Sequence, residues 1–296
     1  MLIEHFIEYL KNEKRYSPHT TVSYRVDLNQ FAGFVRERYN VDSLSSVSYP
    51  MVRAWLMFLL EERLLSARTV NRKLSSLKSF CRFMIRSGLI KTSPLDKITS
   101  PKTRKRLPLF IEEEKLSGLL DNTDFGDDYT GVRNRMIIEM LYHTGIRRSE
   151  LINLRKNDVD LPEMTLRVVG KGNRERLIPL SRRFASFAGE YLKLREDFFR
   201  SSGAADYFLL TSKGEKLYPR LVNRIVKVYL DTITSSEKKS PHVIRHSFAT
   251  HMLNHGAGLN AIKELLGHAN LSATEVYTHN TFEKLKKIYK QAHPRA

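Results

Sequence analysis

The chain has 296 residues, 41% of them hydrophobic and 28% charged, and a formal net charge of +18. This composition excludes a disordered chain and gives enough length for one large folded core or two smaller ones. Because neither folding nor solubility needs so much positive charge, the sequence indicates a polyanionic partner, with nucleic acid favoured over an anionic membrane surface.

The N-terminus and the cysteine content exclude further classes of protein. Glu4, Glu8 and Lys11 interrupt the first apolar residues, so this segment is not expected to be a signal peptide. No apolar run approaches about 18 residues, so no membrane insertion is expected. Cys81 is predicted to be a small core residue. A single cysteine permits neither an internal disulfide nor a cysteine-based zinc site, which fits a reducing cytoplasm.

Residues 1–99 are predicted to form a helical domain. One helix is expected to start with Ser17 as N-cap and Pro18 in its first turn. Its apolar positions, at roughly helical spacing, are Val22, Val26, Phe31 and Phe34. A later helix is expected to end near Gly88. Its apolar stripe, at spacings of four, three, four and three, is Val70, Leu74, Leu77, Cys81 and Met84.

A second stripe on this later helix combines arginines with serines. Its members are Arg68, Arg72, Ser75, Ser79, Arg82 and Arg86. Short serines between arginines would let the helix lie close to a phosphate backbone or in a groove. A solvated basic face is the more common interpretation of one such helix, but the charge of the whole chain favours DNA binding.

Residues 98–110, ITSPKTRKRLPLF, break the helical pattern. Two prolines and a run of basic residues favour an extended, solvated connector, which we place at residues 100–110 before a second domain over 111–296. The basic residues of the connector that are further candidates for DNA contact are Lys102, Arg104 and Lys105.

The second part of the chain mixes helices with a hairpin. Apolar and β-branched residues flank GKGN in residues 165–180, so two strands are predicted with Lys171 at or near the tip of their turn. Helical runs surround this hairpin. The fold class is therefore predicted to be mostly α with a small β-sheet.

Arg147 and Glu150 are the first candidate site residues. Gly145 interrupts a helical pattern and a new helix can begin near Ser149, so Arg147 would project from a bend. Glu150 lies three residues further on and could pair with it. Taken alone, this pair is better interpreted as a structural ion pair.

A helix framed by Ser240, Pro241 and Gly256 places His242 and Arg245 on one face near its N-terminus. The unpaired amide groups and the dipole of that end favour an anion such as phosphate. Histidines four residues apart in this segment also have the spacing of metal ligands. Metal binding is the weaker interpretation, because there is no HExxH motif and no carboxylate inside the helix.

The segment LLGHANLSATEVYTHN, residues 265–280, supplies the last candidates. Gly267 is expected to end a helix and expose His268, while Ser272 and Glu275 match a capping box that starts a short helix carrying Tyr277. One tyrosine alone is usually a packed ring with a hydrogen-bonded hydroxyl. A tyrosine can attack a phosphodiester, however, when arginines, a lysine and histidines stabilise charge and move protons.

Four ordered segments, TGIRRSEL, GKGNRER, HVIRHSFATHML and LGHANLSATEVYTH, resemble the tyrosine recombinases, also called the phage integrase family, and are most similar to the XerC and XerD group. The segment SPHTTVSYRVDL is similar to the N-terminal core-binding domain of the family. The resemblance implies a helical core-binding domain and an α+β catalytic domain that clamp DNA. The roles that it implies are nucleophile for Tyr277, phosphate clamp for Arg147 and Arg245, general acid for Lys171, phosphate binding and proton transfer for His242 and His268, and support of the first arginine for Glu150.

The same resemblance implies a site-specific recombinase that works through a 3′-phosphotyrosyl intermediate without metal or cofactor. It further implies a homo- or hetero-tetramer on duplex recombination sites, with a second Xer-type recombinase as one candidate subunit, in a bacterial cytoplasm on the nucleoid. Chromosome dimer resolution during cell division is the expected role, and the need for an activator protein is open. Residues 281–296 are expected to dock on a neighbouring protomer or on their own domain. The alternatives are a mobile-element integrase, a type IB topoisomerase-like enzyme and a non-catalytic DNA-binding protein.

Overall fold

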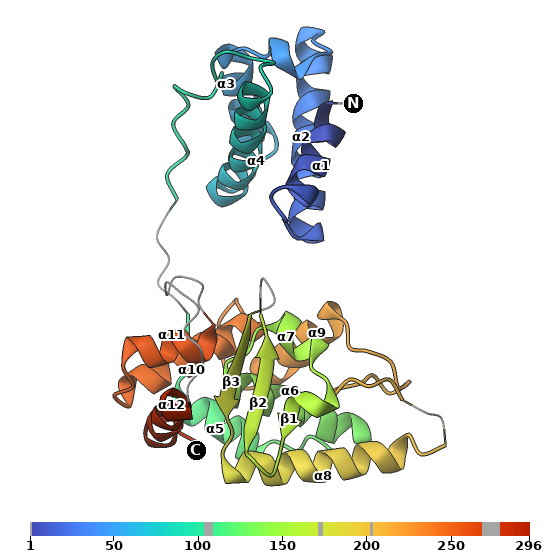
Figure 1. Ribbon diagram of the computed structural model, residues 1–296, viewed down its shortest axis with the longest axis vertical. Coiled ribbons are helices and arrows are strands. Elements are labelled where there is room, and N and C mark those ends of the chain that lie inside the picture. The colour runs from blue at the N-terminus through green and yellow to red at the C-terminus, as the bar shows by residue number, and fades with distance from the viewer. Residues whose placement is uncertain (1, 104–108, 171–173, 202–203, 268–278) are drawn as a thin grey trace. The chain divides into compact units, whose positions relative to one another are not determined.

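The computed structural model describes residues 2–103, 109–170, 174–201, 204–267 and 279–296 (Figure 1). The chain divides into two compact units, Met1–Arg106 and Leu107–Ala296, and each unit is described by itself. In the described ranges, helices predominate and the strands form one small sheet, which confirms the predicted fold class. None of the helices in these ranges is long and apolar enough to cross a membrane.

The first unit is built from helices that pack around an aromatic core. Its elements are α1 (Leu2–Asn12), α2 (Pro18–Tyr39), a 3-10 turn (Leu44–Ser46), α3 (Tyr49–Met57), a π-helical turn (Phe58–Glu62) and α4 (Ala67–Arg86). Ser17 caps α2 as predicted, because its hydroxyl accepts from the Thr20 amide at 3.3 Å. The predicted apolar stripe of α4 is entirely buried, including Cys81. Figure 1 shows α2 running alongside both α1 and α4.

The predicted core face of α2 is wrong at two positions. Val22 and Val26 are 54% and 48% exposed, whereas Phe31 is buried. The inward face of the helix is instead completed by the carboxylate of Asp27, which is 1% exposed and pairs with the Lys73 ammonium at 3.0 Å. A buried carboxylate needs such partners, so this contact with α4 sets the rotation of α2.

The second unit surrounds a small sheet with helices. Its elements are α5 (Glu113–Asn122), α6 (Tyr129–Thr144), α7 (Arg148–Asn153), a 3-10 turn (Lys156–Asp158), β1 (Val159–Asp160), β2 (Thr165–Val169), β3 (Glu175–Pro179), α8 (Arg182–Phe198), α9 (Pro219–Asp231), α10 (Pro241–Asn254), α11 (Leu259–Leu266) and α12 (His279–Ala292). Among the described residues, the sheet has three antiparallel strands in the order β1-β2-β3, with Leu166 opposite Ile178. The predicted hairpin is thus confirmed.

Helix α6 is the centre of this unit. Residues 136–146 are all buried, and α6 packs against α5, α7, α8, α9 and α10. A helix segment that is buried on every side is typical of such a central position. Figure 1 shows α10, α11 and α12 gathered beside β3.

The end of the connector is fixed to α10. The amide of Ile111 donates to the Ser247 hydroxyl at 2.8 Å, and the Ile111 carbonyl lies 2.9 Å from His251 Nε2. The ring of Phe110 meets the His251 imidazole edge-on. Because Ser247, His251 and the Ile111 amide are all buried at this contact, the start of the second unit is held firmly on this helix.

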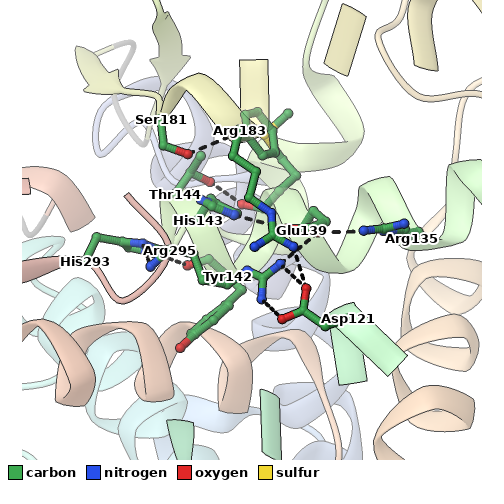
Figure 2. Close-up of polar contacts among 12 residues, drawn as sticks. Asp121, Arg135, Glu139, Tyr142, His143, Thr144, Ser181, Arg183, His293 and Arg295 are labelled. Atoms are coloured by element: carbon green, nitrogen blue, oxygen red, sulfur yellow. Dashed lines mark hydrogen bonds and ion pairs between the residues drawn. The ribbon is translucent and has the colours of Figure 1, made fainter. Parts of the chain in front are cut away.

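The C-terminal tail, residues 279–296, packs on its own unit. The Tyr289 hydroxyl donates to the His143 carbonyl at 3.1 Å, and the Arg295 guanidinium forms a two-bond pair with Asp121 at 2.8 and 2.9 Å. Figure 2 shows this pair beside Glu139 and His143. Among the described residues the tail therefore contacts its own domain, and docking on a neighbouring protomer stays a prediction.

Two buried histidines, His143 and His293, meet where this tail packs on α6. His143 and His293 stack at 4.9 Å, and His143 Nε2 lies 3.0 Å from a Glu139 carboxylate oxygen. The other ring nitrogen of His143 finds no partner among the described residues, so an imidazolium there would bury an unpaired N–H. Burial lowers the pKa of His143 even against Glu139, and burial together with His143 lowers the pKa of His293 much further.

We expect the second unit to lose stability as the pH falls from 7.5 to 5.5. Both pKa values lie below 6.5 in the folded chain, so below that pH the unfolded chain takes up protons that the folded chain does not. Each histidine should remove up to about 1.4 kcal/mol over this whole window, because the unfolded imidazole is only half protonated at pH 6.5. The pKa values of Glu139 and Asp121 are lowered below their usual acidic values, so these groups stay ionised throughout the window and do not offset the loss.

Urea titrations followed by circular dichroism at several pH values would measure this effect. His293→Phe keeps an aromatic ring in place but removes the titrating group, so its unfolding free energy should depend less steeply on pH. If the unfolding free energy of that variant depended on pH as steeply as that of the wild type, the assignment of the pH dependence to His143 and His293 would be contradicted.

Candidate active site

Arg147 and Glu150 lie at the bend between α6 and α7. Gly145 ends α6 with a φ of +59°, and a Cβ there would lie 2.5 Å from the Phe248 ring, so both conformation and space require glycine. Arg147 occupies the N-cap position of α7. Its amide donates to Glu150 Oε2 and its Nη1 to Oε1, both at 2.8 Å. The predicted bend and the predicted pair are therefore both present.

Arg245 lies on α10, about one turn after the start of the helix. The helix starts at Pro241 after Ser240 in the N-cap position, and Gly256 follows it with a positive φ, as predicted. Arg245 is 7% exposed, and its Nη1 and Nη2 donate to the carbonyls of Gly145 and Leu266, each at 2.6 Å. Burial, followed by the charge of Arg147, lowers its pKa to about 10, so it remains charged at neutral pH.

His242 lies one turn before Arg245 and is exposed on the surface of α10. Partial desolvation lowers its pKa, and the charges of Arg148 and Arg245 lower it further. The imidazole is therefore neutral at pH 7, with one nitrogen able to donate and the other able to accept a proton. Because the charges of Arg147, Arg148 and Arg245 all act on it, the His242 imidazole lies near these arginines.

Arg176 completes the cluster and was not singled out in the sequence, although it lies in the segment GKGNRER. It is 5% exposed on β3, and its Nη1 and Nη2 donate to the two oxygens of Glu150 at 3.1 and 2.8 Å. Burial alone would raise the pKa of Glu150, but the bonds from Arg176 and Arg147 outweigh it and hold the pKa below its usual value. The signal in the sequence was strand alternation, which puts Arg176 on the same inward face as Ile178.

Three guanidiniums converge on the C-terminal end of α11. The consecutive carbonyls of Leu265, Leu266 and Gly267 accept from three different arginines, which are Arg176 at 2.8 Å, Arg245 at 2.6 Å and Arg147 at 3.0 Å. The last carbonyls of a helix lack intrahelical partners and carry the negative end of its dipole, so they suit cations. Gly267 ends α11 with a φ of +63°, as predicted.

The cluster keeps a net positive charge that can hold an anion. Among the described residues named above, three guanidiniums accompany one carboxylate, which gives this group an excess of two positive charges. The Arg147 side chain is 33% exposed, which leaves it accessible at the surface while Arg245 and Arg176 lie beneath. Paired guanidiniums in a partly desolvated site bind the two free oxygens of a phosphodiester with defined geometry.

The remaining predicted catalytic residues, Lys171, His268 and Tyr277, lie outside the described residues, as do Ser272 and Glu275 of the predicted capping box. Their described chain neighbours belong to the cluster. Gly170, before Lys171, is bonded through its amide to the Arg174 carbonyl at 2.8 Å and faces Glu150 and Arg176. Gly267, before His268, accepts from Arg147.

The predicted DNA-binding stripe of α4 is largely at the surface of the first unit. Arg68, Arg72, Ser75, Arg82 and Arg86 are exposed, and Ser79 is partly buried. Two of the arginines already have protein partners. Arg72 pairs with Asp27, and Arg86 donates to the Tyr9 hydroxyl at 3.0 Å. In the connector Lys102 is exposed, whereas Arg104 and Lys105 lie outside the described residues.

Comparisons with known proteins identify relatives of the chain. Residues 110–284 match the phage integrase family, and residues 3–88 match the N-terminal SAM-like domain of phage integrases. The chain is 39% identical to the tyrosine recombinase XerC of Chlorobaculum parvum over 99% of this chain and 94% of that protein. It is 41% identical to XerC of Halalkalibacterium halodurans over 98% of this chain and 96% of that protein.

Two solved structures share the fold. The XerH site-specific recombinase bound to its palindromic difH substrate, in a post-cleavage complex, is 22% identical with a TM-score of 0.73, over 96% of this chain and 82% of that chain. The Tn1549 transposon integrase in complex with transposon right end DNA is 20% identical with a TM-score of 0.70, over 97% of this chain and 99% of that chain.

Proposed function

The chain belongs to the phage integrase family of tyrosine recombinases, and from this premise we propose that it cleaves and rejoins duplex DNA with Tyr277 as the nucleophile. It is a site-specific recombinase of the tyrosine type. The observation that best supports the proposed residue roles is the convergence of three guanidiniums on the end of α11, from which the chain continues to His268 and Tyr277.

In the proposed reaction the Tyr277 phenol oxygen attacks the phosphorus, and the bond from phosphorus to the 5′ oxygen breaks. Lys171 donates a proton to the leaving 5′ oxygen, and a 3′-phosphotyrosyl ester forms. The freed 5′-hydroxyl of a second duplex then attacks that ester, which restores the phosphodiester and the phenol. One ester replaces another at each step, so the balance of the reaction requires no nucleotide hydrolysis.

Arg147 and Arg245 are proposed to hold the two non-bridging oxygens and to stabilise the charge of the transition state. Phosphoryl transfer depends mainly on such positioning and charge stabilisation. Both guanidiniums are already fixed by carbonyls and, for Arg147, by Glu150, so little reorganisation is needed when DNA binds. His242, neutral at pH 7, can donate a hydrogen bond to the phosphate or accept the phenol proton with His268.

The finer role that we propose is resolution of chromosome dimers during cell division, in the bacterial cytoplasm on the nucleoid. The two units, joined by the connector, would close on duplex DNA, and the exposed arginines of α4 would contact phosphates. Four protomers, alone or with a second Xer-type recombinase, would hold two duplexes. The names of the two XerC relatives described above support this role, and a mobile-element integrase is the alternative.

The test begins with the DNA target. We expect the protein, mixed with sheared genomic DNA from its source and stopped with detergent, to remain covalently attached to fragments that share one short sequence. Synthetic duplexes carrying that sequence should then give products that join two different molecules, with equal yield in EDTA. Relaxed supercoils without joined products would indicate a topoisomerase, and loss of activity in EDTA would indicate a metal-dependent nuclease. The genes that flank the recovered site would separate a chromosomal role from a mobile element.

A further inference from the structure

We propose that Arg176 is a positioning residue of this active site, which fixes Glu150 and the end of α11 and acts on the phosphate only through them. The inference rests on the proposed function and assigns the part of the site that keeps the phosphate-holding arginine in place. Arg176 would therefore affect the rate of strand cleavage without contacting DNA.

The contacts of Arg176 are directed entirely into the protein. Its guanidinium donates through Nη1 and Nη2 to both oxygens of Glu150 and through Nε to the Leu265 carbonyl at 2.8 Å. Only 5% of the residue is exposed, compared with 33% of the Arg147 side chain. All three guanidinium nitrogens of Arg176 are thus engaged with protein acceptors, and this engagement rather than burial alone sets it apart from Arg245.

Glu150 is the point through which Arg176 reaches Arg147. The carboxylate oxygen Oε1 accepts from Nη1 of both arginines, at 2.8 Å from Arg147 and 3.1 Å from Arg176. The other oxygen accepts from the Arg147 amide and from Arg176. Without Arg176, Glu150 would be a buried carboxylate held by Arg147 alone. The carboxylate could then rotate, and the orientation of the Arg147 guanidinium would no longer be fixed.

Arg176 also supports the chain on either side of the site. It lies on β3, one strand of the hairpin that leads to Lys171, with Val168 opposite it on β2. A Cβ on Gly267 would lie 2.9 Å from Arg176 Nη1, so the end of α11 packs directly on the guanidinium. One side chain therefore joins the hairpin, the Arg147–Glu150 pair and the point from which the chain leaves for His268.

The experiment compares Arg176→Lys and Arg176→Gln with the intact protein on a nicked duplex carrying the recovered target sequence. Single-turnover cleavage should fall about a hundredfold in Arg176→Lys, since small misplacements of catalytic groups have effects of that size. DNA affinity, measured by fluorescence anisotropy, should stay close to the wild-type value. Lysine keeps the charge but cannot reproduce three directed bonds, so it tests geometry, and it carries the test if Arg176→Gln fails to fold.

The pH profile gives a readout that a purely structural role would not move. Without Arg176, burial would raise the pKa of Glu150, and only the charges of Arg147 and Arg245 would oppose that rise. Protonation of Glu150 would release Arg147, so the acid limb of the cleavage profile should move to higher pH in Arg176→Gln. Unchanged limbs in both variants would overturn the inference.

Arg167→Gln is the matched control. It removes an arginine of the same sheet from an exposed pair with Asp158, at 2.9 Å, so both the cleavage rate and the affinity should stay near wild type. A parallel loss of affinity and cleavage in Arg176→Lys would show that Arg176 contacts DNA and would overturn the inference. A wild-type protein that forms no covalent adduct would instead refute the proposed function, so the two failures are distinguishable.

Discussion

Tyr277→Phe is expected to abolish covalent attachment to DNA while leaving DNA binding nearly unchanged. The substitution removes the phenol oxygen that the proposed reaction requires as its nucleophile, and no other step can form the protein–DNA ester without it. Affinity should persist because contacts from lysine and arginine to phosphates supply most of the binding free energy of such complexes. A denaturing gel of a nicked suicide duplex, whose cleavage product cannot be rejoined, measures the trapped adduct directly.

The control for this variant is Tyr218→Phe, which removes the same hydroxyl from another tyrosine of the second unit. The Tyr218 ring is 49% exposed at the start of α9. This variant should form the adduct with normal yield. A normal yield from Tyr277→Phe would end the assignment of the nucleophile and with it the proposed mechanism.

Arg245→Ala is expected to lower the cleavage rate by about 10²–10³-fold, the usual effect of removing one preorganised donor to a developing charge. Arg245 is 7% exposed and its guanidinium keeps its charge at neutral pH, so it would act in a site from which water is largely excluded. Most of the DNA affinity should remain, because the contact gains strength only as charge builds on the phosphate. Single-turnover cleavage at saturating DNA measures the rate separately from binding.

Two companion variants show whether the loss comes from the guanidinium itself. Arg245→Lys keeps a charge but loses the fork, so its rate should fall between those of wild type and alanine. Arg167→Gln, the control described above, removes an arginine from an exposed pair with Asp158, and it should leave the rate at saturating DNA unchanged. An equal loss in Arg167→Gln would contradict a specific clamp. Thermal melts are needed beside Arg245→Ala, because it leaves the carbonyls of Gly145 and Leu266 without their donor.

The sequence predicted best those features that depend on local chemistry. Gly145 and Gly267 each end a helix in the left-handed conformation, and Pro241 starts one, because caps are decided by a few consecutive residues. These local signals place the bend before Arg147 and the helix start before Arg245. The hairpin was equally local, since β-branched residues flank a glycine-containing turn.

The features that the sequence did not reveal depend on distant partners. The rotation of α2 is set by Asp27 against Lys73, which is 46 residues away, so apolar spacing alone misplaced Val22 and Val26. Strand alternation turns Arg176 inward, but nothing local shows that Glu150, 26 residues earlier, will meet it. The two-residue strand β1 is too short to produce a pattern of its own.

The attachment of the connector to α10 has a mechanical consequence. The Ile111 amide is held by Ser247, two residues after Arg245 on the same helix, and its carbonyl by His251 one turn further. A pull on the chain at Ile111 would therefore act directly on α10, the helix that carries Arg245.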